Sequence, residues 1–497
     1  MNKLLLLALV LFGNSFLFSQ DLNYALIDDS LIEKIEEKNE DQFGIYIILE
    51  DRTDLDALES EMQKDKLDNH ARTKKIITTL QNKSKTTQRS LLNNLAKMPG
   101  VDKGSIQSYW ICNSIFLTCD LQTIAELSHD DRLEWIGLNA ELQLTESIDE
   151  ETEATLAASL AMNTEIGLGA INAPAMWELG YTGYGQIALV ADTGIDPTHP
   201  AYSSRYRGNT TRDEEAWFQG EFFDNESPFA CGDHGSHVLG TVLGLDRINE
   251  DTIGVAYNAQ WMGSPNLCFG TGTASNLATF QWAVNPDGDV DTSEDIADVI
   301  NNSWWDPGVR NSECNSLYVD LLDALEMIGV AVIFSAGNAG PEPESITPPK
   351  NISLSEVNVF CVANIRGDSF TPAESSSRGP SVCGGEGSLL IKPEVSAPGV
   401  SVRSAVFEQE YGLKSGTSMA APHVSGSILL LKEAFPYLRG EDLKWALYLS
   451  CRDLGDEGED NTYGMGIIDV RAAYIITWSV RGMNLFLQLL QKVMLCY

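Results

Sequence analysis

A serine stands at a tight glycine turn that leads into an apolar segment. The stretch from Ser415 to Val424 places Gly416 and Thr417 just before Ser418, and apolar residues then recur at three- and four-residue spacing. This spacing predicts a helix with one buried face that begins close to the serine. A helix N-terminus offers free backbone N–H groups and the positive end of the helix dipole, which stabilise negative charge nearby. Ser418 is therefore a candidate nucleophile.

A serine hydroxyl needs a base, a group that orients the base, and a donor for the oxyanion. Upstream motifs supply all three. Asp192 ends an apolar run that is typical of a buried parallel strand, and His234 stands at the start of another apolar helix. Asn338 follows a β-rich run and a glycine, so its amide can donate to an oxyanion. We expect Asp192 to orient His234, which takes the proton of Ser418.

The four motifs occur in the order Asp, His, Asn, Ser, and they resemble those of subtilisin-type serine proteases. Spacing and insertions resemble the bacillopeptidase F subgroup, and the likeness covers most of residues 169–475. The resemblance implies an α/β fold with a mainly parallel sheet and helices on both faces. It also implies hydrolysis of peptide bonds in protein or peptide substrates through Asp192, His234 and Ser418, with Asn338 in the oxyanion hole. No cofactor is required for this chemistry.

The same resemblance extends to the substrate cleft. Residues 298–303 resemble the strand at the sheet edge that pairs with the substrate backbone. Two tryptophans follow where the family more often has small residues, which implies a cleft of different shape. The expected substrate-binding residues are Ser303, Trp304, Trp305, Ser335, Ala336 and Gly337.

The N-terminal region predicts export and a separate small domain. Residues 1–20 combine a short basic start with an apolar core, which predicts a secretory signal peptide and a secreted protein. Residues 21–142 show strand and helix patterns in the order β-α-β-β-α-β, which is ferredoxin-like α+β. The order and the position resemble the propeptide of subtilisin-type proteases. The resemblance implies an intramolecular inhibitor that also assists folding.

Three further segments complete the expected organisation. Residues 143–168 are acidic and rich in Ala, Thr and Glu, which favours an exposed, cleavable linker without strands. Maturation is expected within or just before residues 145–169. The catalytic domain is expected over residues 169–478. Residues 479–497 form an apolar tail without an assigned role, because its charges and short length argue against a bilayer span.

The net charge and the cysteine content exclude some partners and some classes of fold. A formal net charge of −38 over 497 residues argues against nucleic acid or an anionic membrane as partner. Nine cysteines are too few and too scattered for a disulfide scaffold, and their pairing cannot be derived from the sequence. Cys231, three residues before His234, is either paired or a thiol close to the site.

An acidic insert raises the question of a metal ion. Four carboxylates gather there, namely Asp287, Asp289, Asp291 and Asp295. Hard cations prefer such ligands, so a structural calcium is one interpretation, and a solvated acidic loop is the simpler one. No metal ligand is assigned, because the spacing matches a calcium loop only in part and no HExxH motif accompanies His234 and His237.

Two functional hypotheses remain, which are an active secreted endopeptidase and a catalytically silent protein that binds peptides in the same cleft. A silent relative would most simply have lost one of the four residues, and none is lost. An α/β-hydrolase is disfavoured, because the sequence around Ser418 lacks the second glycine of a nucleophile elbow.

Overall fold

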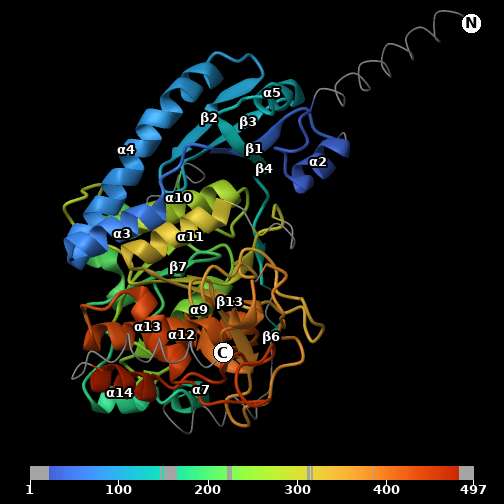
Figure 1. Cartoon of the computed structure of the whole chain (residues 1–497). Coiled ribbons are helices and arrows are strands. Elements are labelled where there is room, and N and C mark those ends of the chain that lie inside the picture. Colours follow the sequence, from blue (N-terminus) through green and yellow to red (C-terminus); the bar gives the residue numbers. More distant parts are fainter. Residues whose placement is uncertain are drawn as a thin grey trace, which may run out of the picture.

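The structure, a computed structural model, describes residues 22–37, 39–145, 148–149, 165–220, 227–309, 314, 317–383 and 385–480. A small N-terminal unit lies above a larger α/β unit in the view of Figure 1. The predicted signal peptide, much of the predicted linker and most of the apolar tail lie outside the described residues.

The small unit is a four-stranded antiparallel sheet with helices, in strand order β2-β3-β1-β4. Its strands are β1 (Phe43–Leu49), β2 (Val101–Tyr109), β3 (Ser114–Cys119) and β4 (Leu133–Leu138). Its helices are α2 (Asp29–Glu36), α3 (Leu55–Asp65), α4 (Asn69–Leu95) and α5 (Leu121–Leu127). This arrangement agrees with the expected ferredoxin-like order, with two helices rather than one between β1 and β2.

Helix α4 illustrates why these residues form a helix. The side chain of Asp68 accepts a hydrogen bond from the Ala71 N–H at 2.9 Å and so caps the first turn. Buried positions then recur every three or four residues, at Ile76, Leu80, Ser84, Gln88, Leu91 and Leu95. One stripe of the helix therefore faces the sheet, while its lysines remain at the surface.

The larger unit is built on six parallel strands in the order β10-β7-β11-β13-β14-β15. They are β7 (Ile187–Ala191), β10 (Gln260–Ser264), β11 (Val299–Asn302), β13 (Ala331–Ser335), β14 (Phe360–Ile365) and β15 (Val395–Pro398). The strand β7 is buried along its whole length, as a parallel strand between two helical layers must be. The expected α/β class and parallel sheet are confirmed.

Helices cover both faces of this sheet. On one face, α9 (His234–Leu243) and α12 (Thr417–Ala434) pack against each other and against the strands. On the other face lie α10 (Thr273–Ala283) and α11 (Leu317–Ile328). The remaining helices are α7 (Ile166–Ala170), α8 (Ala173–Glu178), α13 (Gly440–Leu449) and α14 (Val470–Val480). In the part of the chain that the structure describes, five short 3₁₀ helices lie at Ser203–Arg205, Arg207–Asn209, Asp213–Glu215, Gly387–Leu390 and Phe407–Gln409.

Short strands outside the main sheet connect distant segments. β8 (Leu245–Asp246) pairs with β9 (Asp251–Thr252), and β16 (Val402–Ala405) pairs with β17 (Tyr411–Ser415). Two more strands belong to the predicted linker: β5 (Gln143–Leu144) pairs with β12 (Trp304–Trp305), and β6 (Ile148–Asp149) pairs with β17. These parts of the linker are therefore paired with the large unit, contrary to the expected exposed, strand-free connection.

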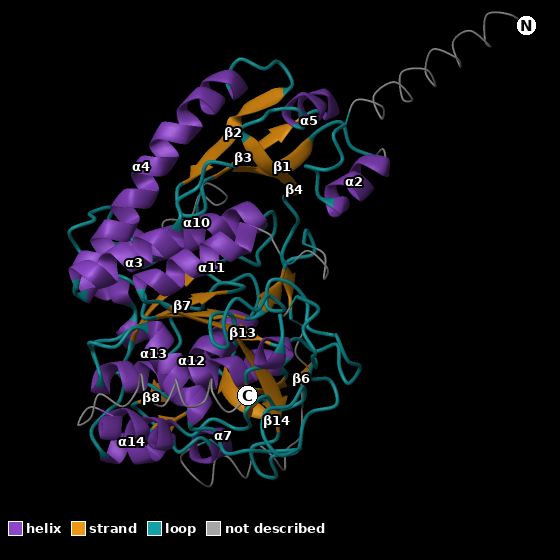
Figure 2. Ribbon diagram, in the orientation of Figure 1, coloured by secondary structure: helices purple, strands orange, loops and turns teal. Residues whose placement is uncertain are grey.

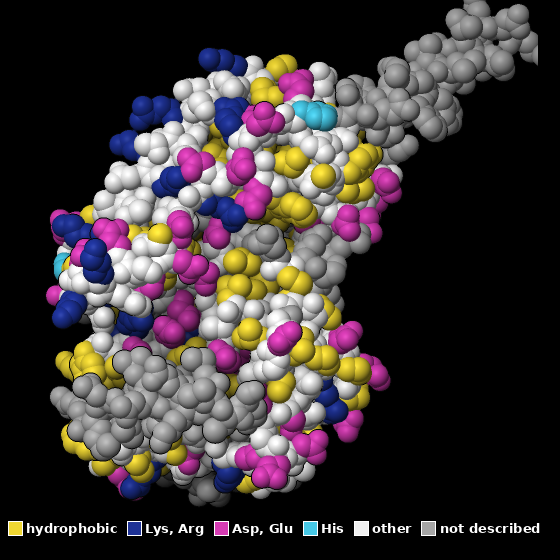
Figure 3. All heavy atoms as spheres, viewed as in Figure 1, with side chains coloured by type: hydrophobic (Ala, Val, Ile, Leu, Met, Phe, Trp, Pro, Cys, Tyr) yellow, Lys and Arg dark blue, Asp and Glu magenta, His cyan; other side chains and the backbone are white. Residues whose placement is uncertain are grey.

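The two units share a hydrophobic core. Helices α3, α10 and α11 lie between their sheets in Figure 2. Tyr46 and Met62 of the small unit belong to the same buried cluster as Phe280, Trp304 and Tyr318 of the large one. Lys and Arg side chains gather over α4 in Figure 3, and Lys74 of this helix forms an ion pair with Asp291 of the acidic insert. The small unit is thus docked by apolar burial and by charge.

Two domain boundaries differ from expectation. The described part of the large unit already begins at Glu165, which forms an ion pair with Arg403 at 2.8 Å, and Leu168 is fully buried in the main core. Helix α14 extends to Val480, two residues beyond the expected end of the catalytic domain at residue 478.

Candidate active site

The candidate base and its orienting carboxylate are hydrogen-bonded. Asp192 follows the last residue of β7, and His234 is the first residue of α9. The His234 Nδ1–H donates to Asp192 Oδ1 at 2.8 Å, and the Thr193 N–H donates to the same oxygen at 2.7 Å. Both side chains are buried, and His234 Nε2 has no hydrogen-bond partner among the described residues. The nitrogen that would take a proton is therefore unoccupied.

Local sequence explains why α9 begins against the aspartate turn. A Cβ at Gly235 would lie 2.2 Å from the carbonyl oxygen of Gly194, so a side chain here would push the helix away from Asp192. The Gly235 N–H donates to Thr193 Oγ1 at 3.0 Å. The Ser236 hydroxyl accepts from the Asp196 N–H at 2.9 Å, which gives this serine a positioning contact.

A disulfide fixes the same turn from outside. Cys231 is bonded to Cys268, and the Cys231 N–H donates to the Thr193 carbonyl at 2.9 Å. The structure thus decides between the two interpretations of Cys231: it is paired. A second disulfide joins Cys314 and Cys383, and the free cysteines among the described residues are Cys112, Cys119, Cys361 and Cys451.

The candidate nucleophile faces a peptide carbonyl of its own chain. Ser418 is the second residue of α12 and is fully buried. Its hydroxyl donates to the carbonyl oxygen of Thr145 at 3.0 Å. Thr145 directly follows β5, so the predicted linker passes over the serine.

Asn338 is held by the first residue of α12. Its Oδ1 accepts from both the N–H and the hydroxyl of Thr417, each at 3.0 Å, and the Thr417 hydroxyl accepts from the Gly337 N–H at 3.0 Å. Because the amide oxygen is used in this way, the NH₂ group of Asn338 is the part that can donate to an oxyanion next to Ser418.

The expected substrate-binding residues divide into two groups. The Ser303 carbonyl accepts from the Thr145 N–H at 3.0 Å, and the Ser335 hydroxyl lies 3.4 Å from Thr145 Oγ1. Trp304 and Trp305 pair with β5 through their backbones. Ala336 donates its N–H to the Val362 carbonyl at 3.0 Å, and Gly337 accepts from the Ser377 N–H at 2.9 Å, so both are held by neighbouring strand and loop backbone.

The sheet-edge expectation is wrong, and the expectation for the two tryptophans fails for Trp304. Residues 299–302 do not form a sheet edge, because β11 pairs with β7 on one side and with β13 on the other. The backbone pairing partner of the linker is the following segment, Ser303 to Trp305. Of the two tryptophans expected to reshape the cleft, Trp304 is fully buried and packs against Phe334 in the core, whereas Trp305 is half-buried.

The sequence does not indicate a lysine that lies at the site. Lys350 is fully buried in the loop before β14, and its Nζ donates to Thr145 Oγ1 at 3.1 Å. Two prolines precede it, a pattern that indicates an exposed loop and gives no signal of a site. Thr417 was also missed, although its position beside Ser418 was a signal.

The comparisons with known proteins assign this fold and site to a family. Residues 183–466 match the family model Peptidase_S8, which describes the subtilase family. The chain belongs to the subtilase family. Bacillopeptidase F of Bacillus subtilis (strain 168) is 31% identical over 391 residues, which are 74% of this chain and 26% of that protein. Subtilisin E of the same organism is 30% identical over 338 residues, 67% of this chain and 77% of that subtilase.

A third relative is the extracellular serine protease of Serratia marcescens, which is 28% identical over 370 residues, 63% of this chain and 34% of that protein. The alignments thus cover about a quarter of bacillopeptidase F and about a third of the Serratia protease.

The acidic insert of this subtilase contacts the small unit. Asp291 pairs with Lys74, and Ser293 Oγ lies 2.9 Å from Nδ1 of His70. The described residues contain no group of three or more His, Cys, Asp or Glu arranged to hold a metal ion. Within the same part of the chain, no helix is both long and apolar enough to cross a bilayer.

Proposed function

We propose that this subtilase is a serine endopeptidase that is exported as a self-inhibited precursor and cuts its own chain after Thr145. The observation that carries the proposal is the 3.0 Å contact between the Ser418 hydroxyl and the Thr145 carbonyl oxygen, and the 2.8 Å hydrogen bond between His234 and Asp192 supports it. The relatives named as proteases support the same activity. The predicted signal peptide and the extracellular Serratia relative support export.

The reaction proceeds through an acyl-enzyme. Ser418 Oγ bonds to the carbonyl carbon of Thr145 while His234 Nε2 takes the hydroxyl proton. Asp192 stabilises the imidazolium that forms. The Asn338 amide and the Ser418 N–H stabilise the oxyanion, a contribution often worth about 3–4 kcal/mol per donor. The imidazolium then protonates the leaving amine, and the peptide bond breaks. Water, deprotonated by His234, releases the acyl group as a carboxylic acid.

The small unit acts in this scheme as the inhibitor. Its docking against α10 and α11 delivers β5 to β12 in register, so that Thr145 is brought to Ser418. After the cut the same backbone hydrogen bonds hold the product in the cleft, and substrates gain access only when the segment leaves.

Labelling with a fluorophosphonate tests the activity directly. We expect the processed protein to be modified at Ser418 and at no other serine, as mapped by mass spectrometry. Ser418→Ala is expected to show no label. Ser427→Ala is the matched control, because this serine lies in the same helix and its hydroxyl donates only to the His423 carbonyl, at 2.8 Å. A chain that is neither processed nor labelled would support the silent peptide-binding protein instead.

A further inference from the structure

Lys350 is a buried lysine that contacts the side chain of the residue before the bond proposed to be cut. It is fully buried, and its Nζ donates to the hydroxyl of Thr145 at 3.1 Å. Taking an ammonium out of water costs several kcal/mol unless a negative charge accompanies it. The hydroxyl is a neutral acceptor, so it satisfies a hydrogen bond but leaves the charge uncompensated.

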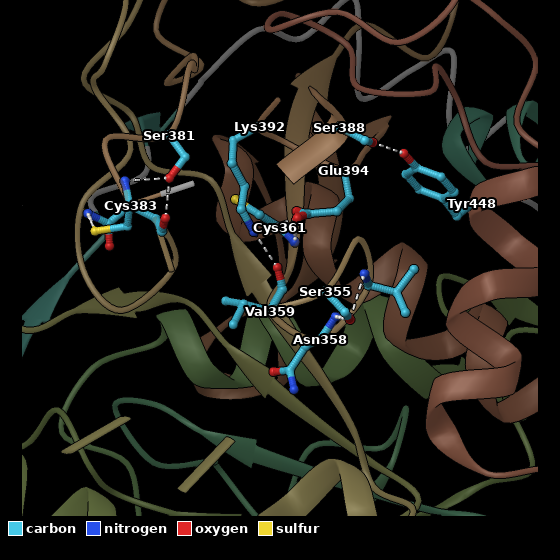
Figure 4. A network of polar contacts seen from close by, with 12 residues as sticks. Ser355, Asn358, Val359, Cys361, Ser381, Cys383, Ser388, Lys392, Glu394 and Tyr448 are labelled. Carbon is cyan, nitrogen blue, oxygen red and sulfur yellow. Dashed lines mark hydrogen bonds and ion pairs between the residues drawn. The ribbon is translucent and has the colours of Figure 1, made fainter. Parts of the chain in front are cut away.

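The other fully buried lysines of the large unit each have a carboxylate. Figure 4 shows Lys392 beside Glu394, with which it forms an ion pair, and its Nζ also donates to the Val359 carbonyl at 2.7 Å. Lys444 likewise pairs with Glu326 at 2.5 Å. A buried lysine in this protein is thus normally neutralised inside the fold.

Lys350 differs from both. No carboxylate in the described residues forms an ion pair with it, and burial lowers the pKa of Lys350 to about 8, with only the Cys361 thiol acting in the opposite direction. Burial raises the pKa of that thiol to about 12, so it is neutral at physiological pH. Glu394 is already used, because it pairs with Lys392 and accepts from the Cys361 N–H at 2.7 Å. The fold therefore supplies no negative charge to Lys350 from the described residues.

Lys350 lies at the end of the pocket for the substrate residue that precedes the cleaved bond, so a negative charge to neutralise its ammonium group would come from a substrate. Thr145 offers its carbonyl to Ser418, so its side chain occupies the pocket for the residue on the acyl side of the cleaved bond. Lys350 Nζ and Ser335 Oγ lie at the end of that side chain. A Cβ at Gly337 would lie 3.6 Å from Nζ, which places the Lys350 side chain close to Gly337, one of the expected substrate-binding residues.

We propose that Lys350 is a specificity-determining residue which selects peptides with an acidic side chain, Asp or Glu, immediately before the cleaved bond. The inference rests on the proposed endopeptidase function. A carboxylate in this pocket would form a charge-assisted hydrogen bond with Nζ and neutralise it. The side chain of the chain's own Thr145 provides only a neutral acceptor, so an acidic side chain in the same pocket would bind Nζ more strongly.

The large negative net charge of the chain does not oppose this preference. Exposed charges farther than about 8 Å from a site are largely screened at physiological ionic strength. A contact of 3.1 Å with a buried ammonium is screened far less and outweighs them.

The test uses processed protein and a set of internally quenched peptides that differ only at the residue before the cleaved bond, with Glu, Asp, Gln, Thr or Leu. We expect kcat/KM for Glu to exceed that for the isosteric Gln by about tenfold to a hundredfold. Lys350→Met is expected to abolish or invert the ratio, and Lys350→Arg to retain it. Lys432→Met is the control for loss of one positive charge, because Lys432 of α12 contacts the Leu438 carbonyl at 2.8 Å and the Asp298 carboxylate at 3.8 Å rather than Thr145.

The outcomes separate the two proposals. Cleavage of Gln or Leu peptides as fast as Glu peptides would overturn the role of Lys350 and leave the endopeptidase intact. An unchanged Glu-to-Gln ratio in Lys350→Met would do the same. Should that variant fail to fold, the wild-type Glu-to-Gln ratio alone decides. Failure to cut any peptide, together with failure to bind a fluorophosphonate, would overturn the proposed function itself.

Discussion

The carbonyl oxygen of Thr145 accepts a hydrogen bond from the Ser418 hydroxyl at 3.0 Å, so the chain carries its own peptide bond at its candidate nucleophile. The two residues are 273 positions apart. Backbone pairing of β5 with β12 sets the register, and the Thr145 N–H bond to Ser303 at 3.0 Å extends that register to the reacting residue.

The first prediction concerns self-processing. The Ser418→Ala chain, expressed alone, is expected to accumulate with residue 145 still joined to residue 146, because the variant has no hydroxyl to form the acyl-enzyme. The wild-type chain is expected to yield a mature fragment that begins at Glu146. Intact-mass spectrometry and N-terminal sequencing distinguish the two. Equal processing of Ser418→Ala and of the Ser427→Ala control would assign maturation to a different protease.

The second prediction concerns the orientation of the base. In Asp192→Asn, the amide can donate to His234 Nδ1 and favour the tautomer that carries its proton on Nε2, which cannot accept the serine proton. We expect kcat for peptide hydrolysis to fall by about 10³–10⁴-fold with little change in KM. Asp196→Asn is the control, since Asp196 lies on the same loop and its side chain accepts from Thr198. A loss of less than tenfold in Asp192→Asn would contradict the assigned role.

Much of this site can be predicted from the sequence, because each catalytic residue lies next to the strand or helix that positions it. Asp192 ends an apolar strand, and His234 and Ser418 begin helices, so the neighbouring sequence of each residue indicates its element. Parallel strands bring such residues to one edge of the sheet. The ferredoxin-like unit is predictable for the same reason, as its strands and helices have clear periodicity.

What could not be predicted depends on contacts between distant segments. Lys350 follows two prolines in a loop, and the groups that interact with its side chain, Thr145 and Cys361, are distant in sequence. The pairing of β5 with β12 cannot be predicted from the sequence either, because a two-residue strand in an acidic linker has no periodicity. The direction of the Trp304 ring follows from the aromatic residues it meets in the core, not from its neighbours in sequence.

The third prediction concerns the disulfide that precedes α9. Cys231 and Cys268 close a loop with a sequence separation of 37, which in the chain-entropy model stabilises the fold by roughly 4 kcal/mol. In a Ser418→Ala background, which prevents self-digestion, replacing both cysteines by serine is expected to lower the free energy of unfolding by up to this amount in denaturant titrations. Cys451→Ser, at a free cysteine, is expected to have a smaller effect. Equal stability of the double variant and its parent would show that the bond does not constrain the fold.

The fourth prediction uses the buried histidine in α12. Burial lowers the pKa of His423 to about 4, although its Nδ1–H donates to the Met419 carbonyl at 2.9 Å. In the unfolded chain its pKa returns to about 6.5. Between these values the unfolded state binds more protons than the folded state, so the contribution of His423 to stability falls as the pH decreases, and below about pH 4 it changes no further.

Other buried groups titrate in the same range with the opposite sign, because burial raises the pKa of Asp306 and Asp323 to about 6. The effect of His423 is therefore measured as a difference. His423→Asn, in the Ser418→Ala background, retains a donor for the Met419 carbonyl but has no group that titrates. Its stability deficit relative to the parent is expected to shrink by up to about 1.4 kcal/mol per unit between pH 6 and pH 4, in urea titrations at each pH. A deficit that stays constant or grows over this range would mean that His423 is already protonated in the folded protein.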